Sequence, residues 1–298
     1  MIRQLLSAGL LLYLTAKAES FSTRYLGRES QSFFNMAAST DDDSNDVTLK
    51  LYYWNLRARG EILRCILQHS RLEWEDCVVT REDWEAGKYD FLPPGKTGKN
   101  LLPVLSIITS SNGNETLLPE SHDIAMWIAE RCEPTLLGQS TEMQEKAREL
   151  WQHADVVQDY IDPILNWYSM EETKEKIRGY LKERFEKDLA FLSSEIGDGP
   201  YVCGFDLSYA DFILFHVLDN LCTLFGEENV LDKAASDATL RTYYDNMYRQ
   251  PAISGRMMER PLAGREEVGQ PGSILYAVKA PSRLDFVRDA WKEHFGDA

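Results

Sequence analysis

The pattern of hydrophobic and polar positions separates the chain after residue 46 into a part of mixed strands and helices and a part that is helical throughout. Short runs of β-branched and aromatic residues alternate with helical periodicity up to residue 134. The predicted elements are, in chain order, a strand at Val47–Trp54, a helix at Glu61–His69, a strand at Trp74–Thr80, an antiparallel pair within Leu101–Ile108 and Thr116–Leu118, and a helix opened by Pro119-Glu120-Ser121. This order predicts a small α/β domain over residues 47–134.

Beyond residue 134 the apolar residues recur every three or four positions, which is typical of amphipathic helices. Thr141 with Gln144 forms one predicted capping box at a helix start, and Ser208 with Asp211 forms another. No strand signal of comparable strength occurs in this part of the sequence. Residues 141–260 are therefore predicted to form an all-α domain.

The first 46 residues are predicted to lie outside the folded part. A basic start, an apolar run from Leu5 to Ala16 and a small-residue region have the layout of a secretory signal. The apolar run has about a dozen residues, whereas a spanning helix needs ~20, so a permanent membrane anchor is not expected. Phe21–Thr40 is similar to a transit peptide, and the two together resemble the bipartite presequence of algae with complex plastids. Simple secretion is an alternative, and translation from Met36 would give a cytoplasmic protein.

The last 38 residues also differ from the predicted domains. The tail, residues 261–298, carries several glycines and prolines and ends in a capped amphipathic segment at Ser282–Phe295. This segment either covers a substrate cleft or docks elsewhere, and the pattern does not separate the two. The chain is thus divided into a presequence and linker (1–46), an α/β domain (47–134), a helical domain (141–260) and a tail (261–298).

Composition and charge exclude several classes of function. The 298 residues are 44% hydrophobic and contain 32 Lys and Arg against 48 Asp and Glu, a net charge of −16. A chain this acidic repels nucleic acids and anionic membrane surfaces, so nucleic-acid binding is not expected. The five cysteines never form a CxxC pair and the five histidines never stand at metal-ligand spacing. We therefore expect buried free thiols and no protein-bound metal.

Five short motifs, in order along the chain, carry a resemblance to a known family. They are the stretch Leu51–Arg64, which ends a strand in Tyr-aromatic and opens a helix with Arg-x-Arg-x-Glu; Trp84 with Lys88; Leu102-Pro103-Val104; Glu120-Ser121; and Gly204 with Ser208-x-x-Asp211. In this order they resemble tyrosine-type glutathione S-transferases, particularly the sigma class, over about Val47 to Arg260. The resemblance implies a thioredoxin-like domain followed by an all-α helical bundle, a homodimer, and glutathione as co-substrate.

The resemblance implies that Tyr53 activates the thiol of glutathione. A thiol has a pKa of about 8.5, so only a few per cent is the nucleophilic thiolate at pH 7. Lowering that pKa by about two units takes roughly 2.7 kcal/mol, and a hydrogen bond to a charged group supplies about 1.5–3 kcal/mol. The Tyr53 hydroxyl can donate this bond without losing its own proton. Arg59, in the first helical turn, would strengthen the positive field, whereas strand alternation sends Tyr52 to the other face.

The γ-glutamyl end of glutathione is assigned to the start of the helix after the hairpin. Ser121 offers a hydroxyl and a helix N-terminus for the α-carboxylate, and Glu120 would receive the ammonium group. In related sigma-type proteins an acid of the partner subunit also reaches this amine. Asp159 is the first candidate for that acid here, and Asp155 is the second.

The rest of the tripeptide is assigned by the same resemblance. The backbone of Leu102 would pair with the extended peptide if the bond to Pro103 is cis. Trp84 and Lys88 would contact the glycyl end, with Lys88 as the counter-charge of its carboxylate. Three residues are candidates for contact with an apolar co-substrate: Leu56, Trp167 and Tyr168.

Transfer of glutathione to an apolar electrophile, as in detoxification, is the predicted activity. Isomerisation or peroxide reduction at the same thiolate, as in the prostaglandin-synthesising members of the sigma class, is one alternative. A non-catalytic ligand carrier or structural protein is the other. Tyr53 and Ser121 argue against a lapsed enzyme, since such a protein has no chemical need for either side chain.

Overall fold

A computed structural model describes residues 47–54, 57–95, 98, 101–132, 134–166, 170–233, 239–259 and 282–296. The predicted presequence lies outside these ranges, as do the predicted co-substrate residues Leu56, Trp167 and Tyr168. Within the described residues, no helix combines the length and apolarity needed to cross a membrane.

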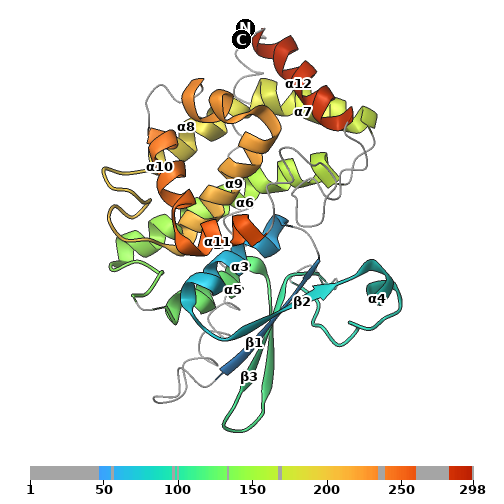
Figure 1. Cartoon of the computed structure of the whole chain (residues 1–298), viewed down its shortest axis with the longest axis vertical. Helices are drawn as coiled ribbons and strands as arrows, with labels where there is room; N and C mark the ends of the chain where they lie inside the picture. Colours follow the sequence, from blue (N-terminus) through green and yellow to red (C-terminus); the bar gives the residue numbers. More distant parts are fainter. Residues whose placement is uncertain are drawn as a thin grey trace, which may run out of the picture. The chain divides into compact units, whose positions relative to one another are not determined.

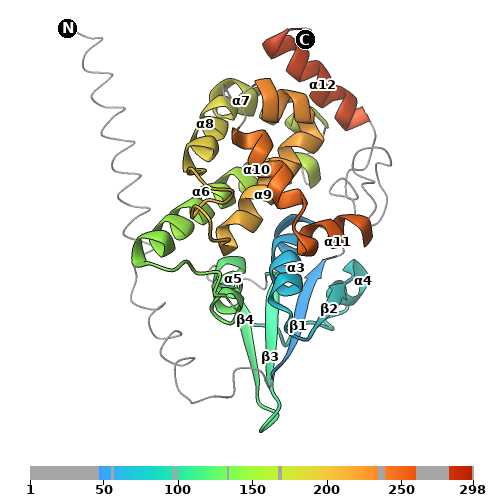
Figure 2. The ribbon, with the colours of Figure 1, turned by 60° about the vertical axis from the view of Figure 1, so that its left-hand side comes forward.

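Four strands form one mixed sheet in the order β2-β1-β3-β4 (Figures 1 and 2). The strands are β1 (Val47–Trp54), β2 (Trp74–Val79), β3 (Val104–Thr109) and β4 (Glu115–Pro119). β1 pairs parallel with β2 and antiparallel with β3, and β3 pairs antiparallel with β4. Together with α3 (Ala58–Ser70) and α5 (Ser121–Glu130), this sheet confirms the predicted thioredoxin-like arrangement.

The two faces of the sheet are covered differently. Leu49 and Leu51 of β1 are fully buried in one cluster with apolar residues of α3 and α5. The other face of the sheet packs on a smaller cluster that includes Tyr89 and Leu92, in the loop after α4 (Arg81–Glu85). The sequence pattern did not predict α4, whose first turn is capped by the Thr80 hydroxyl accepting from the amide of Asp83.

The described helices beyond residue 134 fall within the predicted helical domain, except α12, which is the amphipathic segment predicted for the tail. They are α6 (Thr141–Asn166), α7 (Met170–Glu183), α8 (Phe185–Glu195), α9 (Tyr209–Phe225), the π-helix η1 (Glu228–Lys233), α10 (Thr239–Tyr248), α11 (Pro251–Glu259) and α12 (Ser282–Phe295). The start of α6 differs from the prediction, because Ser140, not Thr141, accepts the capping hydrogen bond from the amide of Met143. The Ser208–Asp211 capping box at the start of α9 is confirmed.

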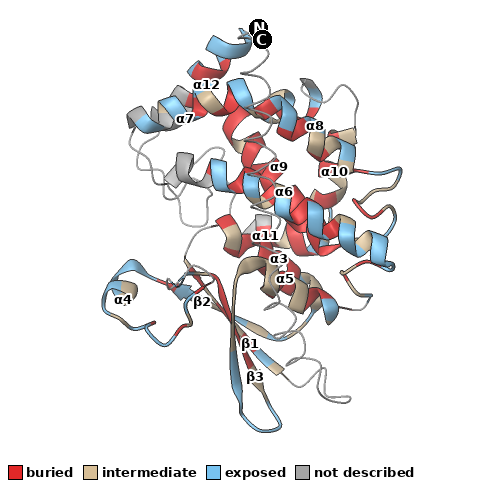
Figure 3. Cartoon of the chain, turned by 180° about the vertical axis from the view of Figure 1, so that it is seen from behind, coloured by how far each residue is buried: buried red, intermediate tan, exposed pale blue. Residues whose placement is uncertain are grey.

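Helix α9 is the centre of the helical part and is buried along almost its whole length (Figure 3). Its Asp211 accepts hydrogen bonds from the amides of Val202 and Ser208 and from the hydroxyls of Ser208 and Tyr243. These donors explain how a carboxyl group is accommodated in a fully buried position. The capping box therefore fixes the start of α9 against the turn that precedes it and against α10.

Helix α12 docks on α7 and α9, which settles where the amphipathic end of the tail packs. Trp291 is 8% exposed, and its ring centroid lies 5.2 Å from that of Phe185 and 5.3 Å from that of Phe225. Arg178 of α7 donates two hydrogen bonds to the carboxylate of Glu293, at 3.0 and 3.1 Å. Most of the stability of this docking should come from Trp291, since the Arg178–Glu293 pair is exposed and such pairs contribute about 0–1 kcal/mol.

Replacing Trp291 with alanine should lower the free energy of unfolding by about 2–3 kcal/mol, below the ~3–5 kcal/mol of an enclosed core tryptophan, because α12 lies at an edge. Urea unfolding followed by circular dichroism measures the change. Asp289→Ala, at an exposed position of the same helix, is the matched control and should shift stability by less than about 0.5 kcal/mol. Equal unfolding midpoints for the two variants would show that α12 is not held by its aromatic face.

Candidate active site

Tyr53 lies near the end of β1 and is 5% exposed. The alternation of β1 turns Leu49, Leu51 and Tyr53 towards the cluster that contains α3. A Cβ atom added at Gly60 of α3 would overlap the Tyr53 ring, so glycine is needed for the helix to pass this close. The guanidinium carbon of Arg64 lies 5.6 Å from the centroid of the same ring.

Tyr52 occupies the opposite face of β1, as predicted from strand alternation. Its ring packs edge-on against Tyr89 and Phe91, with centroid distances of 6.1 and 5.8 Å. The side chain is half-buried and not fully enclosed, because these loop residues cover it only in part. Burial raises the pKa of its hydroxyl to about 12, with a smaller contribution from Cys77.

The pairing register brings three predicted site residues to one end of the sheet. Val104 pairs with Tyr52 on one side and with Pro119 on the other. Tyr53 follows Tyr52, Pro103 precedes Val104 and Glu120 follows Pro119. In this antiparallel pairing all three steps lead to the same end of the sheet. The Leu102–Pro103 peptide bond is cis, which is the condition for the expected backbone pairing of Leu102 with the peptide.

Glu120 and Ser121 form the start of α5. Glu120 has a φ of 73°, in the left-handed region that non-glycine residues rarely adopt. Its carboxylate lies against Gly95, where an added Cβ would come within 2.9 Å of Oε1. Ser121 is the first helical residue, so its amide belongs to the first turn of α5, where backbone N–H groups have no partner within the helix.

Arg59 is held by two carboxylates of α6 in the same chain. Its Nη2 lies 2.9 Å from Oδ1 of Asp155 and 2.6 Å from Oδ1 of Asp159. Burial raises the pKa of Asp155, and Asp159 and Glu120 raise it further, whereas Arg59 opposes the shift. Two carboxylates therefore pair with one guanidinium, and Glu120 is close enough to Asp155 to raise its pKa, so carboxylates outnumber the cation here and the corner suits an ammonium group. Asp159, predicted to serve a partner subunit, here pairs within its own chain.

Trp84 and Lys88 lie in and after α4. The Trp84 ring packs against Trp54 of β1, with centroids 5.2 Å apart. Lys88 is exposed and donates a hydrogen bond from Nζ to Oδ2 of Asp83 at 2.7 Å, which raises the pKa of Lys88. A carboxylate ligand would compete with Asp83 for this ammonium group.

Sequence reasoning missed a column of charged residues that begins at Arg57, directly before α3, and continues along that helix. Arg57, Glu61 and Arg64 follow an i, i+4, i+7 spacing, which places them on one face of the helix and was a readable signal. All three are buried. Their ion-pair partners come from distant segments: Asp219 of α9 for Arg57, Arg256 of α11 for Glu61, and Asp76 of β2 for Arg64. These partners are 162, 195 and 12 residues away in sequence, so no local pattern could identify the first two.

His216 of α9 is buried close to this column. The amide of Asn220 donates to its Nε2 at 3.2 Å, which requires a neutral imidazole. Burial, reinforced by Arg57 and Arg59, lowers the pKa of His216 to about 3. His216 is therefore uncharged in the folded chain at neutral pH.

The buried histidine should make the fold sensitive to acid. The folded-state pKa lies below the unfolded value of about 6.5, so the stabilisation is present above pH 6.5 and is lost as pH falls towards 3. Between pH 7 and pH 5 the free energy of unfolding should fall by about 2 kcal/mol more in the unmodified chain than in His216→Gln. Urea unfolding at both pH values tests this, and parallel losses in the two proteins would contradict the assignment.

The described residues hold no group of three or more histidine, cysteine, aspartate or glutamate side chains arranged to bind a metal ion. All five cysteines fall within those ranges, and none of them is in a disulfide bond. Four of them are buried and Cys77 is partly exposed, which agrees with the expectation of core thiols.

Comparison with known proteins agrees with the fold. Residues 158–255 match the family described as "Glutathione S-transferase, C-terminal domain". The chain is 24% identical over 220 residues to the human hematopoietic prostaglandin D synthase, covering 71% of this chain and 96% of that protein. It is 25% identical over 218 residues to Glutathione S-transferase P 10 of Caenorhabditis elegans, covering 71% and 91%.

Solved structures show the same architecture. The sigma class glutathione S-transferase of Fasciola hepatica superposes with a TM-score of 0.61 at 19% identity, over 72% of this chain and 97% of that one. A sheet of order β2-β1-β3-β4, a cis-proline one position from the Tyr52–Val104 pair and a following helical part give the chain the same two-part, thioredoxin-like fold. The match to the C-terminal domain family and the similarity to these relatives over 71% of the chain support a glutathione S-transferase family for this protein.

Proposed function

We propose that the protein is a glutathione transferase that joins the thiolate of glutathione to apolar electrophiles, a detoxifying reaction. The observation that carries this proposal is the convergence of Tyr53, the cis bond before Pro103 and the start of α5 on one end of the sheet. In this function the Tyr53 hydroxyl donates a hydrogen bond to the glutathione sulfur and stabilises its anionic form. The thiolate then attacks the electrophilic carbon of the co-substrate.

The γ-glutamyl end of glutathione binds at α5 in this proposal. Its α-carboxylate accepts hydrogen bonds from Ser121 and from the amides of the first helical turn. Its ammonium group is attracted by Glu120, which directly precedes Ser121, and by Asp155 and Asp159 on α6. The excess of carboxylates at this corner supports this orientation, because a reversed peptide would place the glycyl carboxylate there without an ammonium group.

The remainder of the site is assigned on the family pattern. The main chain of Leu102 pairs with the cysteinyl unit, and Trp84 and Lys88 meet the glycyl end. Leu56, Trp167 and Tyr168 remain the candidates for the co-substrate. The sigma-like class is also a proposal, supported by the similarity to the Fasciola hepatica protein.

An isomerase is the second candidate function. Relatives of human, chicken, rat and mouse origin are named hematopoietic prostaglandin D synthases, and the match to the human protein covers 96% of its length. Glutathione in such a reaction would be regenerated and not consumed. Loss of free thiol during turnover therefore distinguishes transfer from isomerisation.

A homodimer is proposed for the assembled enzyme. Large apolar side chains stand exposed on the loop after α4 and on α6, namely Phe91 at 53%, Val156 at 40% and Tyr160 at 45%. Side chains of this kind suit burial against a second copy of the chain. Light scattering after size exclusion should give about twice the mass of one chain.

Entry into the secretory route or a plastid through a bipartite presequence is likewise proposed from residues 1–46. The mature N-terminus, read by mass spectrometry from the native source, tests it. A start at Met36 would contradict targeting and favour a cytoplasmic protein.

The proposed activity is tested with the chain from Val47 onward, glutathione and a chlorodinitrobenzene-type electrophile. The proposal expects saturable conjugation that consumes thiol and an equilibrium binding signal for glutathione by calorimetry. Binding without conjugation or isomerisation, in both the unmodified chain and Tyr53→Phe, would favour a ligand carrier. Absence of binding would contradict both candidate functions.

A further inference from the structure

Arg64 is a fully buried arginine that contacts the strand end carrying Tyr53. Its Nε and Nη2 donate to the two carboxylate oxygens of Asp76 in β2, at 2.8 and 3.0 Å. Nη2 also lies 3.2 Å from the carbonyl oxygen of Trp54, the residue that follows Tyr53 in β1. With its guanidinium carbon 5.6 Å from the Tyr53 ring centroid, Arg64 links α3, β1 and β2 around that ring.

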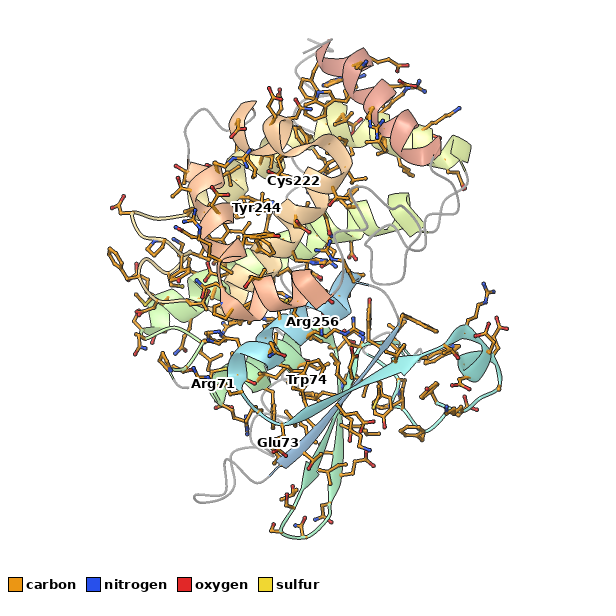
Figure 4. The ribbon with its side chains drawn as sticks, viewed as in Figure 1. Arg71, Glu73, Trp74, Cys222, Tyr244 and Arg256 are labelled. Atoms are coloured by element: carbon orange, nitrogen blue, oxygen red, sulfur yellow. The ribbon has the colours of Figure 1, made fainter. Side chains whose placement is uncertain are left out.

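A second carboxylate connects Arg64 to the helical part. Glu61 Oε2 lies 3.7 Å from Nη1 of Arg64 and 3.2 Å from Nη2 of Arg256 in α11. Figure 4 labels Arg256 at the junction between α11 and α3. The side chains of Glu61, Arg64 and Arg256 are at most 9% exposed. Alternating charges thus run from α11 through α3 to β2, in the order Arg256, Glu61, Arg64, Asp76.

We propose that Arg64 is a positioning residue for Tyr53, fixed by Asp76 and Glu61, and that Arg256 anchors this chain of ion pairs in the helical part. The proposal rests on the proposed role of Tyr53 as the thiolate donor. Arg64 acts by holding the main chain at Trp54 and by lying over the Tyr53 ring, which sets the direction of the hydroxyl.

The chemistry of the side chain explains why an arginine is needed. A planar guanidinium donates to both oxygens of Asp76 and to Trp54 at the same time, whereas a lysine ammonium cannot span these acceptors in one plane. A small displacement of a catalytic donor has a large kinetic effect, of the order of 10²-fold for about 1 Å. Binding of glutathione depends mainly on groups elsewhere, at Ser121, Leu102 and Lys88. Displacing Tyr53 should therefore change kcat much more than glutathione affinity.

The first test compares Arg64→Met and Arg64→Lys with the unmodified enzyme. Arg64→Met should lower kcat by about tenfold or more while the Kd for glutathione, measured by calorimetry, changes by less than about threefold. Arg64→Lys should recover part of kcat, since it keeps the charge but not the planar fork. Arg241→Met is the matched control, because Arg241 also donates to both oxygens of an aspartate, Asp232, but belongs to α10. It should leave kcat within about twofold.

The second test addresses the anchor. Arg256→Met should lower kcat by a smaller factor than Arg64→Met, and the double variant should be no slower than Arg64→Met alone, because both act through one chain of contacts. If the loss of kcat in the double variant equals the product of the two single losses, Arg256 and Arg64 act independently. That result would overturn the anchoring role.

A spectroscopic readout separates this proposal from the proposed function. Fluorotyrosine is incorporated and the ¹⁹F resonance of Tyr53 is assigned from its loss in Tyr53→Phe. Arg64→Met should shift or broaden this resonance, and Arg241→Met should not. If the unmodified chain conjugates nothing while the resonance still responds, the proposed activity fails and the contact between Arg64 and Tyr53 stands. An unchanged resonance, or kcat within twofold in folded Arg64→Met, would overturn the positioning role.

Discussion

Replacing Tyr53 with phenylalanine should lower kcat for glutathione conjugation by about 10- to 100-fold, because a hydrogen bond to a charged group contributes about 1.5–3 kcal/mol. The ring still fills the space beside Gly60, so the fold should be retained. Glutathione affinity at a pH where the thiol is protonated should change little, since the hydroxyl acts on the thiolate. Steady-state kinetics with glutathione saturating measures the effect.

Tyr52→Phe is the matched control for this prediction. Tyr52 is the neighbouring tyrosine on the same strand, but its ring packs against Tyr89 and Phe91 on the opposite face. Removing its hydroxyl should leave kcat within about twofold. Equal losses in the two variants would mean that the effect reports damage to β1 and not a donor at Tyr53.

Replacing Asp219 with leucine should lower the free energy of unfolding by about 3–5 kcal/mol, because it leaves the buried guanidinium of Arg57 without its carboxylate partner. Asp219 also accepts a hydrogen bond from the hydroxyl of Tyr244 at 2.7 Å, so a second buried group loses its acceptor. Since Arg57 precedes α3 and Asp219 belongs to α9, the loss weakens the junction between the sheet and the helical part. Denaturant unfolding provides the measurement.

Two further variants test whether the loss comes from the buried, unpaired charge of Arg57. Asp232→Leu breaks the more exposed pair with Arg241 and should cost about 1 kcal/mol or less. The double variant Arg57→Met, Asp219→Leu should regain much of the stability lost in Asp219→Leu, because no uncompensated charge then remains buried. A double variant as unstable as Asp219→Leu would show that shape, not charge, governs this position.

The elements with strong local patterns could be predicted from the sequence. β1 and α12 have the bounds that alternation and amphipathic periodicity predicted, Val47–Trp54 and Ser282–Phe295. Helix α4 was missed because five polar-rich residues carry no readable period, and only the hydroxyl of Thr80 marks its start. The cap of α6 was misplaced by one residue since Ser140 and Thr141 are both good capping residues, and backbone geometry decides between them.

The candidate site could be predicted only as a set of motifs. The order of strands in a sheet cannot be deduced from local sequence patterns. The proximity of Tyr53, Pro103 and Glu120 was therefore predicted from the family resemblance and not from spacing. The pairing of Val104 with Tyr52 and with Pro119 explains why these three residues meet. The left-handed backbone of Glu120 had no sequence signal, because glycine or asparagine is the usual marker of that conformation.

The ion-pair partners of the charged residues along α3 could not be predicted from the sequence. Arg59 was expected to add positive field beside Tyr53, yet two carboxylates of α6 neutralise it in the folded chain. Arg64, which no motif singled out for a role, is the guanidinium that lies over the Tyr53 ring. Ion-pair partners separated by 100 residues or more depend on the packing of helices, which charge patterns along one helix do not reveal.

The most direct test of the central claim is the pKa of the thiol of bound glutathione, read from thiolate absorbance in the ultraviolet as pH is varied. With Tyr53 donating to the sulfur, the thiol of bound glutathione should ionise about two units below its free value of about 8.5. In Tyr53→Phe its pKa should return towards the free value. A bound thiol that ionises near 8.5 in the unmodified enzyme, or at the same depressed pH in both proteins, would contradict the account.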